Sequence, residues 1–493
     1  MSVNDDSRAR QHEGSPGQRE GGSSRLALIL LIVSGAAFLD FLDVTAVNLA
    51  FSEMQADFGG AEVTDLAWVI TGYSVLFAAL LAPGGRLADV LGRRKVFVFG
   101  AALFTVASLA SAVAPTLAVL VVARFVQGAA AALTLPAGLG IVLAESPPDR
   151  RAAAIGIWGA STAVAAIIGP TVGGLLVDTA GWRSIFLINL PIGALIVFGT
   201  LRLVRPSQRS SGRLPDLAGT VLVGVGVGLL VLGVTQGEEW GWGDPRTVGS
   251  LAGGVVALGL GLLRSRRHPA PAVETVLWRS RKFAMSNAAS VLFGAAMYAW
   301  MLVCALWLIG VWGYSEIEAG LAMSPGAVTG AIGAAVVGRR IEVRGQRAAI
   351  LLGGLIWAAV GLWLVLRLGT EPNFVGIWLP AGLVGGAAMG AIGVGIATAG
   401  VTAVEAARYA AATGLNLTAR QVGGALGVAI LAVILQGAAP GDADPYLAVF
   451  LFCSLGAAAG GAVGLWVRDR ARPVDERPQS AARDRVEQAP QLG

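Results

Sequence analysis

Long apolar stretches alternate with short polar segments along almost the whole chain. Each apolar stretch is close to the roughly 20 residues that a helix needs to cross a hydrocarbon core. Backbone groups find no water in lipid, so only helices or closed barrels can span it, and the alternating pattern of barrel strands is absent. The chain is therefore predicted to be an all-α integral membrane protein with fourteen transmembrane helices, at residues 26–48, 66–84, 96–115, 117–144, 152–177, 184–203, 215–236, 247–264, 283–311, 318–338, 347–367, 375–401, 411–436 and 445–467.

The composition agrees with this prediction and excludes an ordinary soluble domain. Of the 493 residues, 55% are hydrophobic and 14% are charged, and the mean hydropathy is +0.70. The cysteines and histidines are too far apart in the sequence for a metal or redox motif. Neither lysine follows a glycine, so the phosphate-binding loop of an ATP-driven pump is absent. We expect no cofactor, no metal and no nucleic-acid partner.

The positive charges between the predicted helices lie mainly on one side of the membrane. The segments after the second, fourth, sixth, eighth and tenth predicted helices hold most of the arginines and both lysines. The opposite segments have few cations and several acidic residues. The positive-inside rule then places both termini in the cytoplasm.

A short pattern occurs twice in the chain. An acidic residue, a glycine and an arginine follow Gly85 at positions +4, +7 and +9, and they follow Gly338 at the same offsets. The two sets are Asp89, Gly92 and Arg94, and Glu342, Gly345 and Arg347. Both segments join the second and third helices of a six-helix set, which predicts two related parallel halves with a substrate site where they meet.

The domain organisation follows from these halves. We expect a polar cytoplasmic tail at residues 1–25, a six-helix bundle at 26–203 and a linker with two inserted helices at 204–282. A second six-helix bundle is expected at 283–467, followed by a charged cytoplasmic tail at 468–493.

The stretch "GGRLADVLGRRKVF", residues 84–97, is read as a cytoplasmic loop between the second and third helices. It resembles the loop signature of the major facilitator superfamily, and the motifs below resemble that family's fourteen-helix drug:proton antiporter branch. Asp89 with Arg93 and Arg94 would form a charge cluster that re-pairs when the cytoplasmic side opens, with the glycines allowing close approach of the helix ends. The alternative is that the arginines only anchor the topology. Val90 departs from the family pattern, which usually has a basic residue there.

The first predicted helix carries two acidic residues three positions apart, Asp40 and Asp43. Ionisable groups at bilayer depth are costly and point to function, and two such neighbouring carboxyls suit a reversible proton carrier. The stretch "LDVTAVNLA" resembles the helix-1 motif of the antiporter branch, which includes Asp43, Thr45 and Asn48. For Asp43 the alternative is a structural carboxylate that is hydrogen-bonded to a neighbouring helix. Asp40 lies outside this motif, and for it a structural and a functional role are both open.

Two further motifs support the same branch. In "RFVQGAAAALTLP", Arg124, Gln127 and Gly128 resemble the helix-4 motif, in which the arginine is linked to proton transfer. The stretch "GIWGASTAVAAIIGPTVGG" resembles the helix-5 antiporter signature, although Ala165 replaces an expected glycine. The residues that match that signature are Gly156, Gly169, Pro170, Gly173 and Gly174. A purely structural kink is the alternative for this helix.

The resemblance extends to "GWRSIFLINLPIG" at residues 181–193 and to "GLNLTARQVGGALGVAIL" at residues 414–431. It thus covers both halves and implies the major facilitator fold. Side chains that could line a central substrate cavity are Tyr73, Trp158, Asn416 and Gln421. Aromatic residues at a membrane interface are the alternative explanation for the first two.

These observations predict a monomeric, multi-pass protein of the cell membrane that exports lipophilic or drug-like small molecules. Inward movement of protons, with Asp43, Asp40 and Arg124 as the coupling residues, would supply the energy. A narrow exporter of one metabolite or of a self-made antibiotic is the main alternative. A membrane solute sensor or an integral-membrane enzyme is the alternative from another class.

Overall fold

The structure is a computed structural model that describes residues 16–47, 50–59, 62–206, 216–436 and 443–467. All regular secondary structure in these ranges is helical. Among the described residues, thirteen helices are long and apolar enough to cross a membrane. A further helix of 30 residues, α7 (Arg151–Ala180), lies against α2 and α14.

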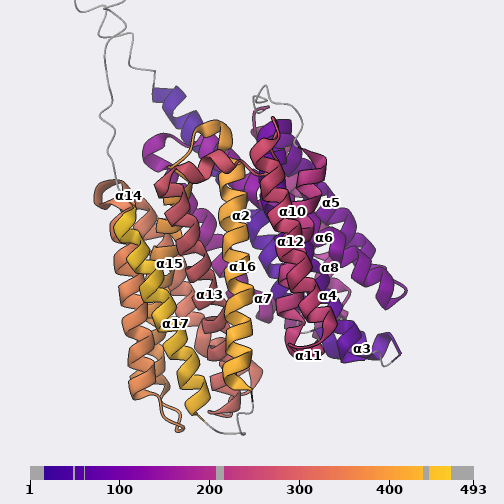
Figure 1. Cartoon of the computed structure of the whole chain (residues 1–493), viewed down its shortest axis with the longest axis vertical. Coiled ribbons are helices and arrows are strands. Elements are labelled where there is room, and N and C mark those ends of the chain that lie inside the picture. The colour runs from indigo at the N-terminus through magenta and orange to yellow at the C-terminus, as the bar shows by residue number, and fades with distance from the viewer. Residues whose placement is uncertain (1–15, 48–49, 60–61, 207–215, 437–442, 468–493) are drawn as a thin grey trace, which may run out of the picture.

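The helices form two groups that stand side by side (Figure 1). The N-terminal group comprises α2 (Pro16–Val47), α3 (Phe51–Asp57), α4 (Val63–Leu91), α5 (Arg93–Ala112), α6 (Leu117–Glu145), α7, α8 (Ser184–Leu187) and α9 (Asn189–Leu203). The C-terminal group comprises α13 (Arg281–Gly310), α14 (Glu316–Arg367), α15 (Leu379–Val401), α16 (Tyr409–Leu435) and α17 (Asp444–Val463). A short turn of another helix type precedes α15, at Phe374–Trp378, and another precedes α16, at Ala406–Arg408.

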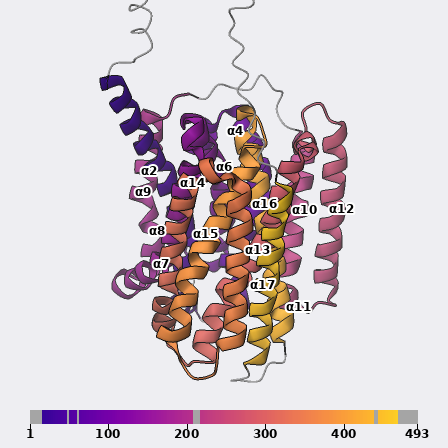
Figure 2. The ribbon, with the colours of Figure 1, turned by 90° about the vertical axis from the view of Figure 1, so that its left-hand side faces the viewer.

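An inserted hairpin connects the two groups. It consists of α10 (Leu217–Thr235), the short α11 (Gly237–Trp240) and α12 (Pro245–Arg267). Helix α10 packs against α4 and α16, whereas α12 packs mainly against α10 and stands at the edge of the molecule (Figure 2). A single helical turn, Thr275–Arg279, then leads into α13.

Every predicted apolar stretch lies on a helix, but the prediction of a loop at residues 84–97 was wrong. Helix α4 continues to Leu91 and α5 begins at Arg93, so only Gly92 leaves the helical conformation. Asp89 and Arg93 of this stretch are buried at the junction of the two groups, so they do not need an exposed loop. A φ of 102° at Gly92 reverses the chain in one residue, and glycine reaches that conformation without a steric penalty.

The segment between the tenth and eleventh predicted helices is also shorter than expected. Helix α14 carries both stretches and is interrupted only at Gly345, whose φ is 79°. The two repeat glycines, Gly92 and Gly345, therefore share a positive φ. The short helices α3 and α11 have no counterpart among the predicted elements.

The two groups share one hydrophobic core at the end of the molecule where α4 ends and α16 begins. We call this end the Asp89 end. Buried side chains from both groups belong to that core, including Leu81 and Leu139 from one and Ala334 and Leu417 from the other. Helix α2 begins and α17 ends at this same end (Figure 1).

Candidate functional site

A closed polar network surrounds Asp43 in the middle of the N-terminal group. The carboxylate is 1% exposed and forms an ion pair with Nη1 of Arg124, which is equally buried. Asn189 Nδ2 donates to Asp43 Oδ1 over 2.9 Å, and Gln127 Nε2 lies 3.4 Å from the same oxygen. Gln127 Nε2 also donates to Ser108 Oγ over 2.8 Å. Four helices, α2, α5, α6 and α9, thus meet at one carboxylate.

Helix geometry explains why Arg124 and Gln127 act together. Residues three apart lie on one face of α6, so both side chains reach toward α2. Arg124 Nε donates to the carbonyl of Val69 over 2.9 Å, and its guanidinium lies over the ring of Tyr73 at 4.5 Å from the centroid. Gly128 allows this close contact with α4, because a β carbon there would lie 2.2 Å from the carbonyl oxygen of Tyr73.

Burial makes the Asp43–Arg124 pair sensitive to any movement of its helices. A buried charge is tolerated only when it is paired and hydrogen-bonded, and losing one partner costs several kcal/mol, about 3–5. Asp43 has almost no exposure to solvent in this conformation. The carboxylate is therefore closed off from solvent in this conformation.

Asp40 lies one turn before Asp43 on α2 and is 4% exposed. Its Oδ2 is buried and has no hydrogen-bond partner among the described residues. Unpaired buried polar atoms are uncommon in proteins, and each calls for an explanation. Asp40 thus lies close to Asp43 but does not share its hydrogen-bond network. It stays a candidate proton-coupling residue.

The helix-5 signature packs α7 against α2 next to this network. A β carbon at Gly169 would lie 1.9 Å from Oγ1 of Thr45, and one at Gly173 would lie 2.9 Å from the α carbon of Ala46. Only glycine permits this approach, so the two glycines position α2 directly after Asp43. Gly174 is half-buried on the same helix.

Two of the predicted motif residues lie wholly or partly outside the described part of the chain. Asn48 lies outside the described residues, and so does the side chain of Pro170. Thr45 uses its hydroxyl within its own helix, donating to the carbonyls of Phe41 and Leu42 over 3.1 and 3.0 Å.

A second cluster joins the two groups at the Asp89 end. Asp89, at the end of α4, accepts hydrogen bonds from the backbone N–H groups of Ala410 and Ala411 over 3.3 and 2.8 Å. These are the second and third residues of α16, whose own N-cap side chain makes no capping bond. The carboxylate of one group therefore caps a helix of the other and interacts favourably with its dipole.

Arg93 links the same elements. Its Nε donates to Asp89 Oδ1 over 2.8 Å, its Nη1 to the carbonyl of Gly140 over 3.2 Å, and its Nη2 to the carbonyl of Ala406. The guanidinium groups of Arg93 and Arg151 both lie over the ring of Tyr409, at 5.6 and 5.3 Å from its centroid. Tyr409 belongs to the C-terminal group and both arginines to the N-terminal group. We call Asp89, Arg93, Arg151, Tyr409 and the first turn of α16 the gate cluster.

Four glycines bring the groups into backbone contact at this end. At each of them a β carbon would lie 2.2–2.6 Å from a carbonyl oxygen of the opposite group. The pairs are Gly85 with Ala410, Gly414 with Leu81, Gly156 with Ala334, and Gly338 with Ala152. Within each pair of helices the glycine and the carbonyl are four positions apart, so the α4–α16 seam and the α7–α14 seam repeat the same geometry.

The other charged residues of the predicted repeat are Arg94, Glu342 and Arg347. Arg94 Nη2 donates to the carbonyl of Leu201, in the N-terminal group, over 2.5 Å. Arg347 is exposed, and the side chain of Glu342 lies outside the described residues. The sequence grouped Arg94 with the gating charges, but the contact described here is within its own group.

Comparison with known proteins agrees with this arrangement. The family model "Major Facilitator Superfamily" matches residues 33–428. The chain belongs to the major facilitator superfamily. It is 36% identical over 420 residues to a probable actinorhodin transporter of Streptomyces coelicolor, covering 82% of this chain and 72% of that protein. It is 35% identical over 426 residues to the multidrug resistance protein Stp of Mycobacterium tuberculosis, covering 86% of this chain and 79% of that protein.

These relatives place the chain in the drug-efflux branch of the superfamily, as a multi-pass protein of the cell membrane. The fold is also similar to that of the human organic anion transporter MFSD10, with a TM-score of 0.64 and 14% sequence identity. That alignment covers 90% of this chain and 99% of the other.

The residues that were predicted to line the substrate cavity lie in two places. Tyr73 and Trp158 are buried in the core shared by both groups, and Nε1 of Trp158 has no partner among the described residues. Asn416 is buried near Ser286, and its Nδ2 also has no partner in the described part of the chain. Gln421 is half-buried and accepts a hydrogen bond from Tyr298 over 2.5 Å.

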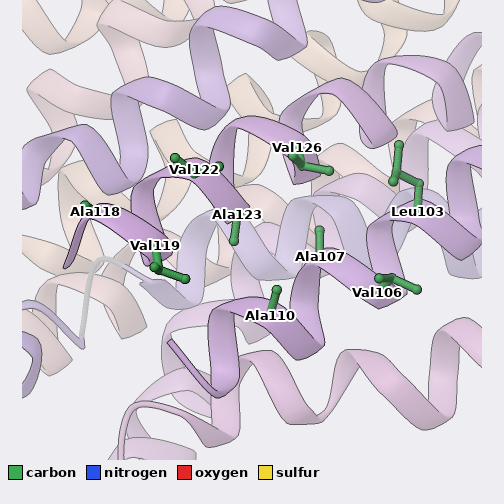
Figure 3. Close-up of a pocket in the computed structure, with 9 residues that line it drawn as sticks. All are labelled: Leu103, Val106, Ala107, Ala110, Ala118, Val119, Val122, Ala123 and Val126. Carbon is green, nitrogen blue, oxygen red and sulfur yellow. The ribbon is translucent and has the colours of Figure 1, made fainter. Parts of the chain in front are cut away.

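One groove of about 420 Å³ lies on the outer surface between α5 and α6 (Figure 3). Its nine lining residues are all alanine, valine or leucine, and Val106 and Val122 are mostly exposed. It contains no polar side chain that could orient a ligand and lies apart from Asp43. In the described ranges, no cluster of three histidine, cysteine or acidic residues could hold a metal ion.

Several residues that these sites use were not predicted from the sequence. Asn189 and Ser108 contact the Asp43 network, and Tyr409 and Arg151 complete the gate cluster. Asn189 was contained in the quoted stretch "GWRSIFLINLPIG", where an amide within an apolar run was an available signal. Tyr409 had no such signal, because its role depends on two arginines far away in the sequence.

Proposed function

We propose that this drug-efflux transporter couples export to inward movement of protons by alternating access between its two groups of helices. The observation that carries the proposal is the buried Asp43–Arg124 ion pair at the meeting point of four helices. A carboxylate whose partner is fixed can bind a proton in one conformation and release it in another. No additional cofactor is needed, because a membrane potential supplies about 2.3 kcal/mol per charge per 100 mV.

We infer a topology of fourteen transmembrane helices, with α7 as the span beyond the thirteen described above. The two groups would be the two six-helix halves, and the α10–α12 hairpin the inserted pair. The Asp89 end is assigned to the cytoplasm, because the arginine-rich segments after α4 and α6 and at the end of α12 lie there. Both termini would then be cytoplasmic.

The conformation described here would be closed toward the cytoplasm. The gate cluster and the four glycine contacts hold α4 to α16 and α7 to α14 at this end. Opening requires Asp89 to leave the first turn of α16, and that exchange of partners is small enough for a ligand or proton to drive. Movement of α2 against α7 at Gly169 and Gly173 would then change the surroundings of Asp43.

The substrate is proposed to pass between the groups, near Tyr73, Trp158, Asn416 and Gln421. The unpaired Nδ2 of Asn416 and Nε1 of Trp158 supply hydrogen-bond donors among apolar and aromatic surfaces, which suits lipophilic compounds. A narrow and a broad range of substrates each have a relative in support. The actinorhodin transporter supports a narrow exporter, and the multidrug resistance protein supports a broad one.

Reconstituted transport tests the coupling. Purified wild type and Asp43→Asn would be placed in vesicles with an imposed pH gradient and a fluorescent lipophilic substrate. We expect gradient-driven transport to fall at least about tenfold in Asp43→Asn, while substrate exchange without a gradient persists, because only the proton step is lost. Asp178→Asn, which changes an exposed carboxylate on α7, is the control. Wild-type gradient-driven rates in Asp43→Asn would reject the assignment of Asp43.

A further inference from the structure

Glu274 lies between two arginines that belong to different groups of helices. Its Oε1 pairs with Nη1 of Arg86, and its Oε2 lies 2.9 Å from Nε of Arg408. The Glu274 side chain is 8% exposed, and those of Arg86 and Arg408 are 13% and 37% exposed. One buried carboxylate therefore bridges two cations and offsets part of the repulsion between them.

The two arginines lie on opposite sides of the α4–α16 seam. Arg86 follows Gly85 near the end of α4, in the N-terminal group. Arg408 directly precedes α16, in the C-terminal group. Glu274 belongs to neither group, since it lies in the segment between α12 and α13. It connects the two sides of the α4–α16 seam from outside.

The inserted hairpin holds this segment in place. Asp216, at the start of α10, pairs with Arg264 near the end of α12, and its N–H donates to the carbonyl of Ala270 over 2.9 Å. The N–H of Val273 lies 3.4 Å from Oγ of Ser265, also on α12. The backbone leading to Glu274 is thus fixed to the base of the hairpin.

The hairpin also covers the same seam farther along the helices. Val227 and Val231 of α10 pack with Val75 and Ala78 of α4 and with Val422 of α16. The contacts of α10 and the ion pairs of Glu274 therefore lie along one line between the two groups.

We propose that Glu274 is a positioning residue of the transport cycle and that the α10–α12 hairpin places it there. It holds Arg86 and Arg408 together while the Asp89 end is closed, and it keeps only one of them when that end opens. This inference rests on the proposed alternating access. It assigns to the inserted helices a role in the stability of the closed state.

Replacing the carboxylate by an amide turns attraction into repulsion. In Glu274→Gln, two guanidinium groups from opposite sides of the seam face each other without an anion between them, and like charges in a partly buried site repel. The closed state is destabilised, and the open state is not, because the arginines separate there. Removing one cation as well, in Glu274→Gln with Arg408→Gln, relieves the repulsion.

The distance between spin labels on the two groups measures this effect. Lys95 and Arg340 are exposed at the Asp89 end, one in each group, and would be changed to cysteine and labelled in full-length protein in lipid nanodiscs. We expect the ratio of open to closed distances to rise about tenfold in Glu274→Gln, equivalent to about 1.4 kcal/mol. The double variant should return at least partly toward wild type.

The control is Asp244→Asn, which removes the carboxylate of the Asp244–Arg246 pair at the opposite end of the same hairpin. It should leave the distances unchanged. If wild type shows two distance populations and Glu274→Gln leaves their ratio unchanged, the role of Glu274 is rejected while alternating access stands. If wild type shows a single distance at every pH and with substrate, alternating access and this inference fail together. An equal shift in the control and in Glu274→Gln would also reject the inference.

Discussion

Gly85 on α4 lies against the carbonyl group of Ala410 on α16, so closely that a β carbon on Gly85 would stand 2.2 Å from the oxygen. These residues come from different groups of helices and are more than 300 positions apart in the sequence. Gly85 therefore lies in a close contact between two helices and not in a loop. It is the surface on which one half of the transporter rests against the other.

This contact predicts the effect of a methyl group at Gly85. In Gly85→Ala, the new β carbon meets backbone rather than a flexible side chain, so the two groups must move apart. Such overpacking typically costs about 1–3 kcal/mol, here only in the closed state. The spin-label distance between Lys95 and Arg340 should shift toward the open population. Gly35→Ala on α2, where a β carbon would meet no atom within 4 Å, should have no such effect.

Removing the charge of Asp89 should change backbone hydrogen exchange at the start of α16. Asp89→Asn removes the charge that caps α16, and we expect the closed state to lose about 1–2 kcal/mol. Backbone amides of the first turn of α16, including Ala410 and Ala411, should then exchange faster. Asp65→Asn, an exposed acid in the first turn of α4, is the matched control. Unchanged exchange at residues 409–414 would contradict the capping role.

Replacing Asn189 by an apolar residue should reduce both stability and transport. Asn189→Leu removes the donor that lies 2.9 Å from Asp43 Oδ1 and leaves a buried carboxylate with fewer hydrogen bonds, at a cost of about 1–3 kcal/mol. The melting temperature in detergent should fall, and gradient-driven transport should fall with it. Ser161→Ala is the control, because that hydroxyl bonds only within its own helix, to the carbonyl of Trp158. Full transport in Asn189→Leu would show that the amide is not part of the Asp43 site.

A pair at the opposite end of the molecule predicts a dependence of stability on pH. The hydrogen bond from Arg183, followed by that from Trp182, holds the pKa of Asp57 below its usual value. Because the pKa is lower in the folded state, the contribution to stability is complete above the unfolded pKa, about pH 4, and is lost as the pH falls through the folded value.

The measurement for this pair compares melting temperatures across pH. Asp57→Asn should melt below wild type at neutral pH, and the difference should shrink as the pH falls below about 4. Asp178→Asn, on the same side of the molecule, serves as the control. A difference between Asp57→Asn and wild type that grows toward acidic pH would have the wrong sign for this mechanism.

Much of this transporter follows from its sequence alone. Helix positions were predictable because the length of an apolar stretch is a local property set by the thickness of the bilayer. Asp43 and Arg124 were identified for a similar reason, since any charge within such a stretch is costly. The repeated pattern after Gly85 and Gly338 predicted two related halves, and its glycines Gly92 and Gly345 share a positive φ.

Tertiary structure alone decided which charged side chains lie next to each other. Asp89 caps a helix that begins 320 positions later, at Tyr409, and Glu274 finds one arginine on each side of a seam. Nothing local marks such partners, because a surface or linker charge costs little and looks the same in the sequence whether it is solvated or paired. Hydrophobic patterning specifies where the helices are, and only their packing brings these charges close enough for Coulombic and hydrogen-bond energies to act.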